Sequence, residues 1–285
     1  MSLQFDKAYR LQIDDLVIES AQNPTPLRIS FRIERTSDAT HNKAAIEIYN
    51  LAKATRDRIL TSSVKVTLEA GYQNRVGLIF SGNILPRGIS HPRQGPDIVT
   101  KLQAGDGENS LRTSRVNENF GPKARLTDVL IKLADKFQGV SAEKAKARIR
   151  KGDFEGAFKE YANGLSSVGS LRTEFGHLMA TAGLTWSIQS GELQVLEEEE
   201  TTQELAFEVG PGSGLIGSPE HGDVNSKKSG GAIKFRSLIQ AAIAPGRKVV
   251  LKSDSINGTM KVFHTVNVGD THGEQWFTEA EGRPV

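Results

Sequence analysis

The sequence contains no cysteine among its 285 residues. Disulfide bonds and thiolate metal sites are therefore excluded, so the fold does not need an oxidising compartment and cannot contain a zinc ribbon. Long apolar runs are also missing, since no stretch approaches the roughly 20 residues that span a bilayer. The first residues of the chain lack the charged and apolar regions of a signal peptide. We therefore expect no membrane span and no export through a signal peptide.

A large excess of one sign of charge is missing as well. The chain has 36 Lys and Arg residues against 34 Asp and Glu residues, which gives a formal net charge of +2. Both signs are interspersed, so no sustained basic stripe could grip phosphates, and a dedicated nucleic-acid-binding protein is not expected. The hydrophobic content of 37% is ordinary for a globular protein, and the length allows two or three packed units.

The first part of the chain has the period of β-strands. In residues 27–34, apolar side chains alternate with Arg, Ser and Glu, which predicts a strand with one buried face. Similar β-rich runs follow at residues 45–51, 64–72, 76–84 and 98–104, with a short helix expected at 54–60. Residues 1–108 are therefore predicted to form one antiparallel β-barrel or sandwich with short connections.

The middle of the chain changes to a helical period. Residues 126–137 place their apolar side chains on one helical face, and the charged, alanine-rich residues 142–161 predict a second helix, which Gly152 and Gly156 weaken. A third helix is expected at 171–182, ending at Gly183. Two strands, 186–189 and 193–196, follow around the turn Ser190-Gly191. We expect residues 109–203 to be an α+β insert domain.

The last part of the chain returns to strands, and residues 204–285 are predicted to form a second β-module. A strand at 204–209 precedes residues 210–231, whose density of Gly, Ser and Pro predicts a long functional or mobile loop. A short helix is expected near 237–243. Asn257-Gly258 predicts a tight hairpin turn before a strand at 260–268, and the turn at 269–273 leads into a strand that contains Trp276 and Phe277.

Side chains with catalytic or metal-binding chemistry form no recognisable constellation. The six histidines, at positions 41, 91, 177, 221, 264 and 272, have no spacing that would place two metal ligands on one helix face. Residues 210–214 have neither the spacing of a nucleophile elbow nor the Gly-Lys-Ser/Thr ending of a phosphate loop. We assign no catalytic, cofactor-binding or metal-binding residues, and we expect no cofactor.

Glycoside hydrolysis is the enzymatic alternative, because it needs two carboxylates at a fixed separation. Glu118 and Glu174 are the least implausible pair, although nothing in their local sequence distinguishes them from the other acidic residues. The run Glu197 to Glu200 is interpreted as a solvated exit from a strand. Trp186 and Trp276 could stack on sugars or bases, but core packing is the preferred interpretation for both.

The order of the elements resembles that of baseplate hub proteins from contractile phage tails, the Mu-like phage hub or late control protein D family, over nearly the whole chain. The C-terminal part of the pattern comprises the turn at Asn257-Gly258, the strand and turn at 260–273, and residues 215–220 and 243–249. The insert contributes Phe120-Gly121-Pro122 before the first helix, residues 171–183, 186–188 and 191–193. The N-terminal part contributes 46–51, 66–72 and 79–84.

This resemblance implies a mainly β fold with two modules like the tail tube protein and a helix-containing middle domain. It further implies a homotrimer, in which six modules form a ring of pseudo-sixfold symmetry between the sixfold tube and the threefold spike. Edge strands would pair across chains. The chain lacks an evident C-terminal spike, so the resemblance implies a separate spike protein, and hence a phage or tailocin hub.

The implied partners are the central spike protein, the tail tube protein or a tube initiator, and other baseplate proteins. DNA or the tape-measure protein would pass through the lumen without specific binding. The implied location is the baseplate of the virion tail, assembled in the cytoplasm of the bacterial host. A structural hub without enzymatic activity is the primary hypothesis. A tail-tip peptidoglycan hydrolase and another tube or adaptor protein of the tail are the alternatives.

Overall fold

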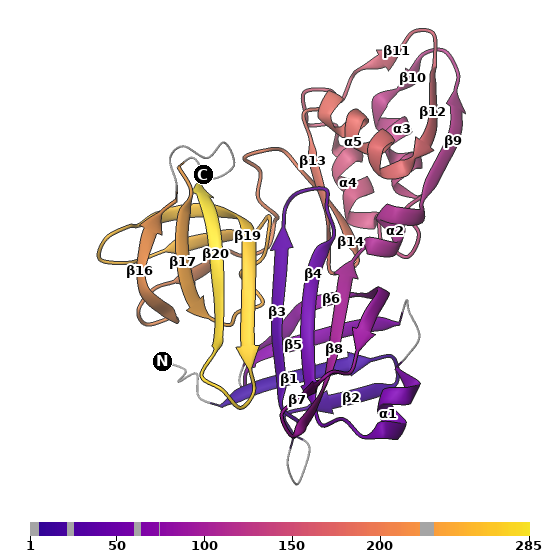
Figure 1. Cartoon of the computed structure of the whole chain (residues 1–285). Coiled ribbons are helices and arrows are strands. Elements are labelled where there is room, and N and C mark those ends of the chain that lie inside the picture. Colours follow the sequence, from indigo (N-terminus) through magenta and orange to yellow (C-terminus); the bar gives the residue numbers. More distant parts are fainter. Residues whose placement is uncertain (1–5, 22–25, 60–63, 74, 223–230) are drawn as a thin grey trace. The chain divides into compact units, whose positions relative to one another are not determined.

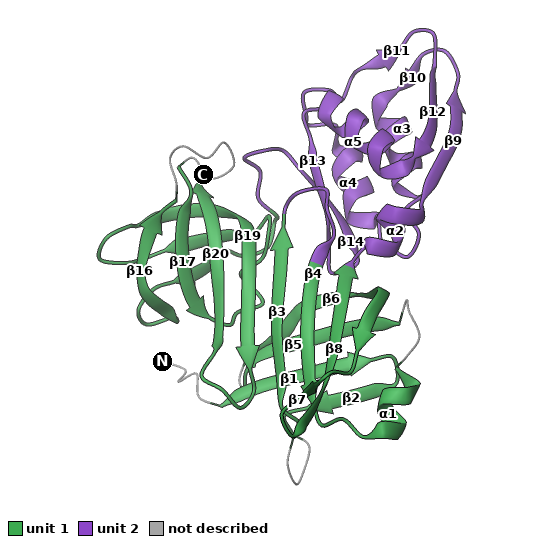
Figure 2. Ribbon diagram, in the orientation of Figure 1, with its two compact units in different colours: residues 1–36, 43–105, 202–285 green, residues 37–42, 106–201 purple. Residues whose placement is uncertain are grey.

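The computed structural model describes residues 6–21, 26–59, 64–73, 75–222 and 231–285. The chain divides into two compact units, which Figure 2 shows in different colours. Unit 1 consists of residues 1–36, 43–105 and 202–285, and unit 2 of residues 37–42 and 106–201. Within the described residues, no helix is long and apolar enough to cross a membrane.

Unit 1 is built on one 14-stranded sheet, which joins the N-terminal and C-terminal parts of the chain. Its hydrogen-bonded path runs β16-β17-β20-β19-β3-β4-β8-β6-β5-β1-β2 (Figure 1). The N-terminal elements are β1 (Lys7–Ile13), β2 (Leu16–Glu19), β3 (Ile29–Thr36), β4 (Asn42–Tyr49), α1 (Lys53–Arg58), β5 (Lys65–Tyr72), β6 (Arg75–Ser90), β7 (Arg93–Gln94) and β8 (Asp97–Asp106). The C-terminal strands are β15 (Phe207–Val209), β16 (Leu215–His221), β17 (Ile233–Leu238), β18 (Lys248–Leu251), β19 (Gly258–Asp270) and β20 (Trp276–Pro284).

The pairing of β3 with β19 joins the two ends of the sequence. Seven residue pairs, from Ser30 opposite Asp270 to Thr36 opposite His264, form this antiparallel ladder. The predicted alternation is visible in β3, where Ile29, Phe31 and Ile33 are buried. The mainly β fold class is confirmed.

Unit 1 contains two separate hydrophobic clusters. The first lies under the N-terminal strands and includes Ile33, Leu68 and Phe80, together with Ile239 and Trp276 from the C-terminal part. The second lies among the C-terminal strands and consists of Val209, Ile233, Phe235, Ile243, Val249, Leu251, Met260, Val262 and Ala280. One continuous sheet therefore covers two cores.

Unit 2 contains the remaining helices and three two-stranded sheets. Its elements are α2 (Glu108–Thr113), β9 (Arg115–Phe120), β10 (Ala124–Arg125), α3 (Leu126–Ala134), α4 (Glu143–Lys151), β11 (Glu160–Tyr161), β12 (Leu165–Ser170), α5 (Leu171–Thr181), β13 (Thr185–Gln189) and β14 (Glu192–Leu196). The apolar faces of α3 and α5 meet in one core around Phe137, Phe175 and Trp186. The predicted turn between β13 and β14 forms, with positive φ at Ser190 (56°) and Gly191 (80°).

Three sequence predictions for the C-terminal part are wrong. Residues 215–221, placed within a loop at 210–231, form β16, which is held by backbone pairing with β17 and has little apolar pattern. The residues 223–230 of that predicted loop lie outside the described residues. No helix forms at 237–243. Ser237 still belongs to β17, and the apolar residues Ile239 and Ile243 are each buried in a different one of the two cores.

The third wrong prediction is the tight turn at Asn257-Gly258. Residues 252–257 connect β18 to β19, and Asn257 does not have a positive φ. Its side chain instead closes the connection, because Nδ2 donates to the Ser253 carbonyl at 2.7 Å and Oδ1 accepts from the Ser253 N–H at 2.8 Å. The predicted helix at 142–161 is shorter, since Gly152, with a φ of 66°, ends α4.

Candidate functional site

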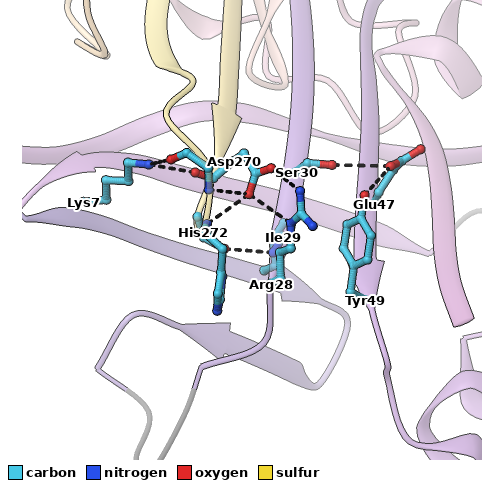
Figure 3. A network of polar contacts seen from close by, with 10 residues as sticks. Lys7, Arg28, Ile29, Ser30, Glu47, Tyr49, Asp270 and His272 are labelled. Atoms are coloured by element: carbon cyan, nitrogen blue, oxygen red, sulfur yellow. Dashed lines mark hydrogen bonds and ion pairs between the residues drawn. The ribbon is translucent and has the colours of Figure 1, made fainter. Parts of the chain in front are cut away.

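Asp270 is the centre of a polar network at the turn between β19 and β20 (Figure 3). Its Oδ2 lies 2.6 Å from Nη2 of Arg28, and its Oδ1 lies 3.2 Å from Nε of the same guanidinium. Oδ1 also accepts the backbone N–H groups of His272 and Gly273, each at 3.0 Å. One carboxylate therefore shapes the turn and ties it to a residue 242 positions earlier in the sequence.

Electrostatics keep this carboxylate ionised. Burial alone raises the pKa of Asp270, but the hydrogen bonds from Arg28 and from the His272 N–H outweigh it, so the pKa lies below its ordinary value. Arg28 also lies over the ring of Tyr49, 4.5 Å from the centroid, and Tyr49 donates to Glu47 at 3.2 Å. The network thus extends from the turn across β3 to β4.

The turn is bound by two further N-terminal residues. Lys7 of β1 donates its Nζ protons to the carbonyl of Asp270 at 2.9 Å and to that of Gly273. Thr271 pairs with Ile29, because its N–H donates to the Ile29 carbonyl and its Oγ1 accepts the Ile29 N–H, both at 2.9 Å. We call Lys7, Arg28, Ile29, Asp270, Thr271, His272 and Gly273 the turn network. The contacts of Lys7, Arg28 and Ile29 join the N-terminal part of unit 1 to this C-terminal turn, whereas the hydrogen bonds from the His272 and Gly273 N–H groups shape the turn itself.

The two carboxylates of the hydrolase alternative lie on neighbouring elements, β9 and α5. Glu118 of β9 binds Lys132 at 2.7 Å and Lys136 at 2.6 Å. Hydrogen bonds from Lys132, the larger cause, and from Lys136 lower the pKa of Glu118 to about 2. A glycosidase acid needs a raised pKa, so Glu118 has the opposite property. Glu174 of α5 accepts a hydrogen bond from Ser167 at 3.1 Å.

The remaining candidates have structural surroundings. Trp186 and Trp276 are buried in the cores of units 2 and 1, which confirms core packing. The indole N–H of Trp276 donates to the Gly71 carbonyl at 2.9 Å. His264 lies within β19, 3.5 Å from Glu34. Within the described ranges, no group of three or more His, Cys, Asp or Glu residues could hold a metal ion.

The interpretation of Glu197 to Glu200 as a solvated exit agrees with the exposure of Glu198 and Glu199, but Glu197 and Glu200 also form an ion-pair cluster that the sequence did not predict. Both oxygens of Glu200 bind Arg148 of α4, with Nε at 2.8 Å from Oε1, and Glu197 lies 3.2 Å from Nη2 of the same guanidinium. The Arg148 side chain is only 11% exposed and also binds Asp153. Sequence reasoning missed this cluster because the partners are about fifty positions apart, as the separations of 49 and 52 show.

Asp106 is a second residue that sequence reasoning missed. Its carboxylate accepts the backbone N–H groups of Ser190 and, at 2.9 Å, Gly191. The buried Asn42 donates to the Ile188 carbonyl at 2.9 Å. Asp106 and Asn42 hold the β13–β14 hairpin in place within unit 2. No local sequence pattern predicts these two roles.

A protein-family model described as baseplate hub gp41 matches residues 11–267. The chain belongs to the baseplate hub gp41 family. The protein is therefore a structural component of a phage baseplate hub. A search of curated proteins found no match.

Solved structures agree with this fold at very low sequence identity. The 43 kDa tail protein of prophage MuSo2 from Shewanella oneidensis has a TM-score of 0.64 at 8% identity, and the match covers 98% of this chain and 97% of that chain. A tail protein from Neisseria meningitidis MC58 has a TM-score of 0.63 at 10% identity, with coverage of 98% and 96%. Both show that the hub shares the fold of phage tail proteins.

A third similar structure comes from a secretion system. The E. coli c3393 protein is a type VI secretion component described as structurally similar to the T4 bacteriophage tail proteins gp27 and gp5. Its TM-score is 0.63 at 10% identity, and the match covers 96% of this chain and 76% of that chain. The fold of the hub is thus also similar to that of a type VI secretion component.

Proposed function

We propose that three copies of the hub form a closed ring of pseudo-sixfold symmetry that joins the tail tube to a separate central spike. Family membership over residues 11–267 is the observation that carries this proposal. The similarity to a protein related to gp27 and gp5 supports a position next to a spike. Heterologous contacts between identical chains close into a ring when the rotation per chain completes a circle.

Each chain contributes two β-modules to this ring, residues 1–108 and 204–285, with residues 109–203 as the insert domain. The two separate hydrophobic clusters of unit 1 support a division into two modules. The turn network would hold the two modules of one chain together, because it joins the C-terminal hairpin to Lys7 and Arg28, and β19 pairs with β3. Six modules then surround one axis.

The ring leaves an open channel for DNA or the tape-measure protein. The formal net charge of the chain is only +2. Such a charge suits a channel lining that does not retain DNA, because dense Lys and Arg would bind the phosphates through counterion release. Further partners are the tube protein or a tube initiator and other baseplate proteins. Assembly takes place in the bacterial cytoplasm before the tail is complete.

The copy number is tested by native mass spectrometry of the purified hub, alone and with the product of the neighbouring gene. We expect a species of three times the 31.0 kDa chain, and a larger species when the spike is added. A hub that stays monomeric under both conditions, or that forms an even-numbered closed assembly, would contradict the ring.

The hub is further proposed to have no enzymatic activity. The lowered pKa of Glu118 supports this, since both lysines hold the carboxylate in its ionised form. In a peptidoglycan gel assay we expect no clearing by the wild type, by Glu118→Gln or by Glu174→Gln. Clearing by the wild type that either substitution abolishes would establish the hydrolase alternative instead.

A further inference from the structure

Among the strands that the structure describes, β16 is the outermost at one end of the sheet of unit 1. The hydrogen-bonded path of that sheet begins with β16, and β17 is its neighbour on the path (Figure 1). An outermost strand presents N–H and C=O groups that could pair with a strand of another chain. The end of the sheet is therefore where a second copy of the hub could be added by backbone pairing.

Two features interrupt the ladder of β16. Ile216 pairs with Arg236, and the next pair is Glu220 with Lys234, so four steps along β16 correspond to two along β17. This bulge of two extra residues contains Gly217, whose φ of 69° lies in the left-handed region. The bulge also contains Pro219, which has no backbone N–H to donate.

The side chains of β16 add to this effect. Pro219 is the buried residue of the strand, and the exposed residues are Ile216, Gly217, Ser218, Glu220 and His221, of which only Ile216 is a large apolar residue. In the adjacent β17, by contrast, six consecutive pairs with β20 form an unbroken ladder. Proline, a bulge and an exposed charge are the devices by which edge strands avoid pairing with other chains.

We propose that β16 is a closed edge, which ends the sheet and does not accept a strand from a second copy of the hub. This inference refines the ring proposed above. It rests on the ring in one respect, which is that the copies contact one another through surfaces other than β16. The predicted pairing of edge strands across chains then excludes β16. The bulge prevents strands of further copies from adding to the edge of this sheet. A regular, hydrophobic edge strand would permit such addition and so the formation of open-ended fibres.

The test is a variant with a regular edge, made by deleting Gly217 and Ser218 and substituting Pro219→Thr. The remaining threonine then stands opposite Phe235, between the pairs Ile216–Arg236 and Glu220–Lys234. Pro219→Ala, which keeps both extra residues, is the matched control. In sedimentation velocity over a tenfold concentration range, we expect the control to match the wild type and the regular-edge variant to at least double its weight-average mass.

A regular-edge variant that is folded by circular dichroism and keeps the wild-type mass would overturn the proposal. If that variant does not fold, hydrogen exchange of the wild type decides. The amides of residues 215–221 should exchange at the same rate, within twofold, in dilute and in assembled hub, and a slowing of more than tenfold on assembly would overturn the closed edge. The native mass of the wild type tests the ring separately, so the two failures are distinguishable.

Discussion

At the scale of single residues, Asp270 links the two ends of the sequence within unit 1. Its carboxylate binds Arg28 through both oxygens and caps two N–H groups of its own turn, with a side chain that is 14% exposed. The sequence indicated the turn itself, because Gly269 and Gly273 flank a polar segment. It could not indicate Arg28 as the partner, since no local period relates residues 242 positions apart.

Substitution of Asp270→Asn should lower the free energy of unfolding at pH 7 by about 1–3 kcal/mol, because a charged hydrogen-bond acceptor is lost from a half-buried site. The native pKa of Asp270 lies below its ordinary value. Its contribution is therefore complete above the unfolded pKa, about 3.9, and is lost as the pH falls through the native pKa. Urea unfolding should show the difference between variant and wild type at pH 7 and its decrease below about pH 4.

The control for this prediction is Asp57→Asn. Asp57 pairs with Lys53 at 2.8 Å on the exposed surface of α1, where ion pairs contribute little. We expect this variant to unfold at the wild-type midpoint at pH 7. A difference for Asp270→Asn that is as large at pH 3 as at pH 7 would show that the ionised carboxylate is not its cause.

At the scale of elements, buried charge connects α4 of unit 2 to the segment that follows β14. Arg148 projects from α4, and Glu197 and Glu200 come after β14. Burial lowers the pKa of Arg148, but the hydrogen bond and charge of Glu200 and the charges of Asp153 and Glu197 outweigh it and raise the pKa above its ordinary value. Removal of the guanidinium leaves these carboxylates close together without their cation.

We therefore expect Arg148→Gln to lower the stability of unit 2 by about 2–3 kcal/mol, the range for loss of hydrogen bonds to a charged group. Differential scanning calorimetry should show a lower midpoint for the transition of unit 2. Glu199→Gln changes one charge in the same run of glutamates without touching Arg148, and its midpoint should stay unchanged. Equal shifts for both variants would mean that overall charge, and not this cluster, stabilises the unit.

Elements with a strong period could be predicted from the sequence. The apolar faces of α3 and α5 and the alternation of β3 are buried as expected. β16 could not be predicted, because only Pro219 among its residues is buried and its pairing depends on the backbone of β17. The apolar run near Ile239 was misinterpreted as a helix because burial in a core and helix formation leave the same composition.

At the scale of the whole molecule, the sequence order of elements was more informative than any site. Two tail proteins with 8% and 10% identity have a similar fold over 98% of the chain, so the arrangement of elements is shared although few residues are identical. The continuity of one sheet over two cores could not be foreseen, because it requires β19 to pair with β3 across most of the sequence. The ring proposal depends on this arrangement.

The most direct measurement is a reconstruction of the assembled hub by electron cryomicroscopy, calculated without imposed symmetry. The account predicts three copies around an open channel, with residues 1–108 and 204–285 of each copy superposing on one shared barrel at alternating positions around the axis. A threefold axis should emerge from the unsymmetrised map, with β16 unpaired to any neighbouring chain. An assembly without a threefold axis, or terminal modules that do not superpose, would contradict the central claim.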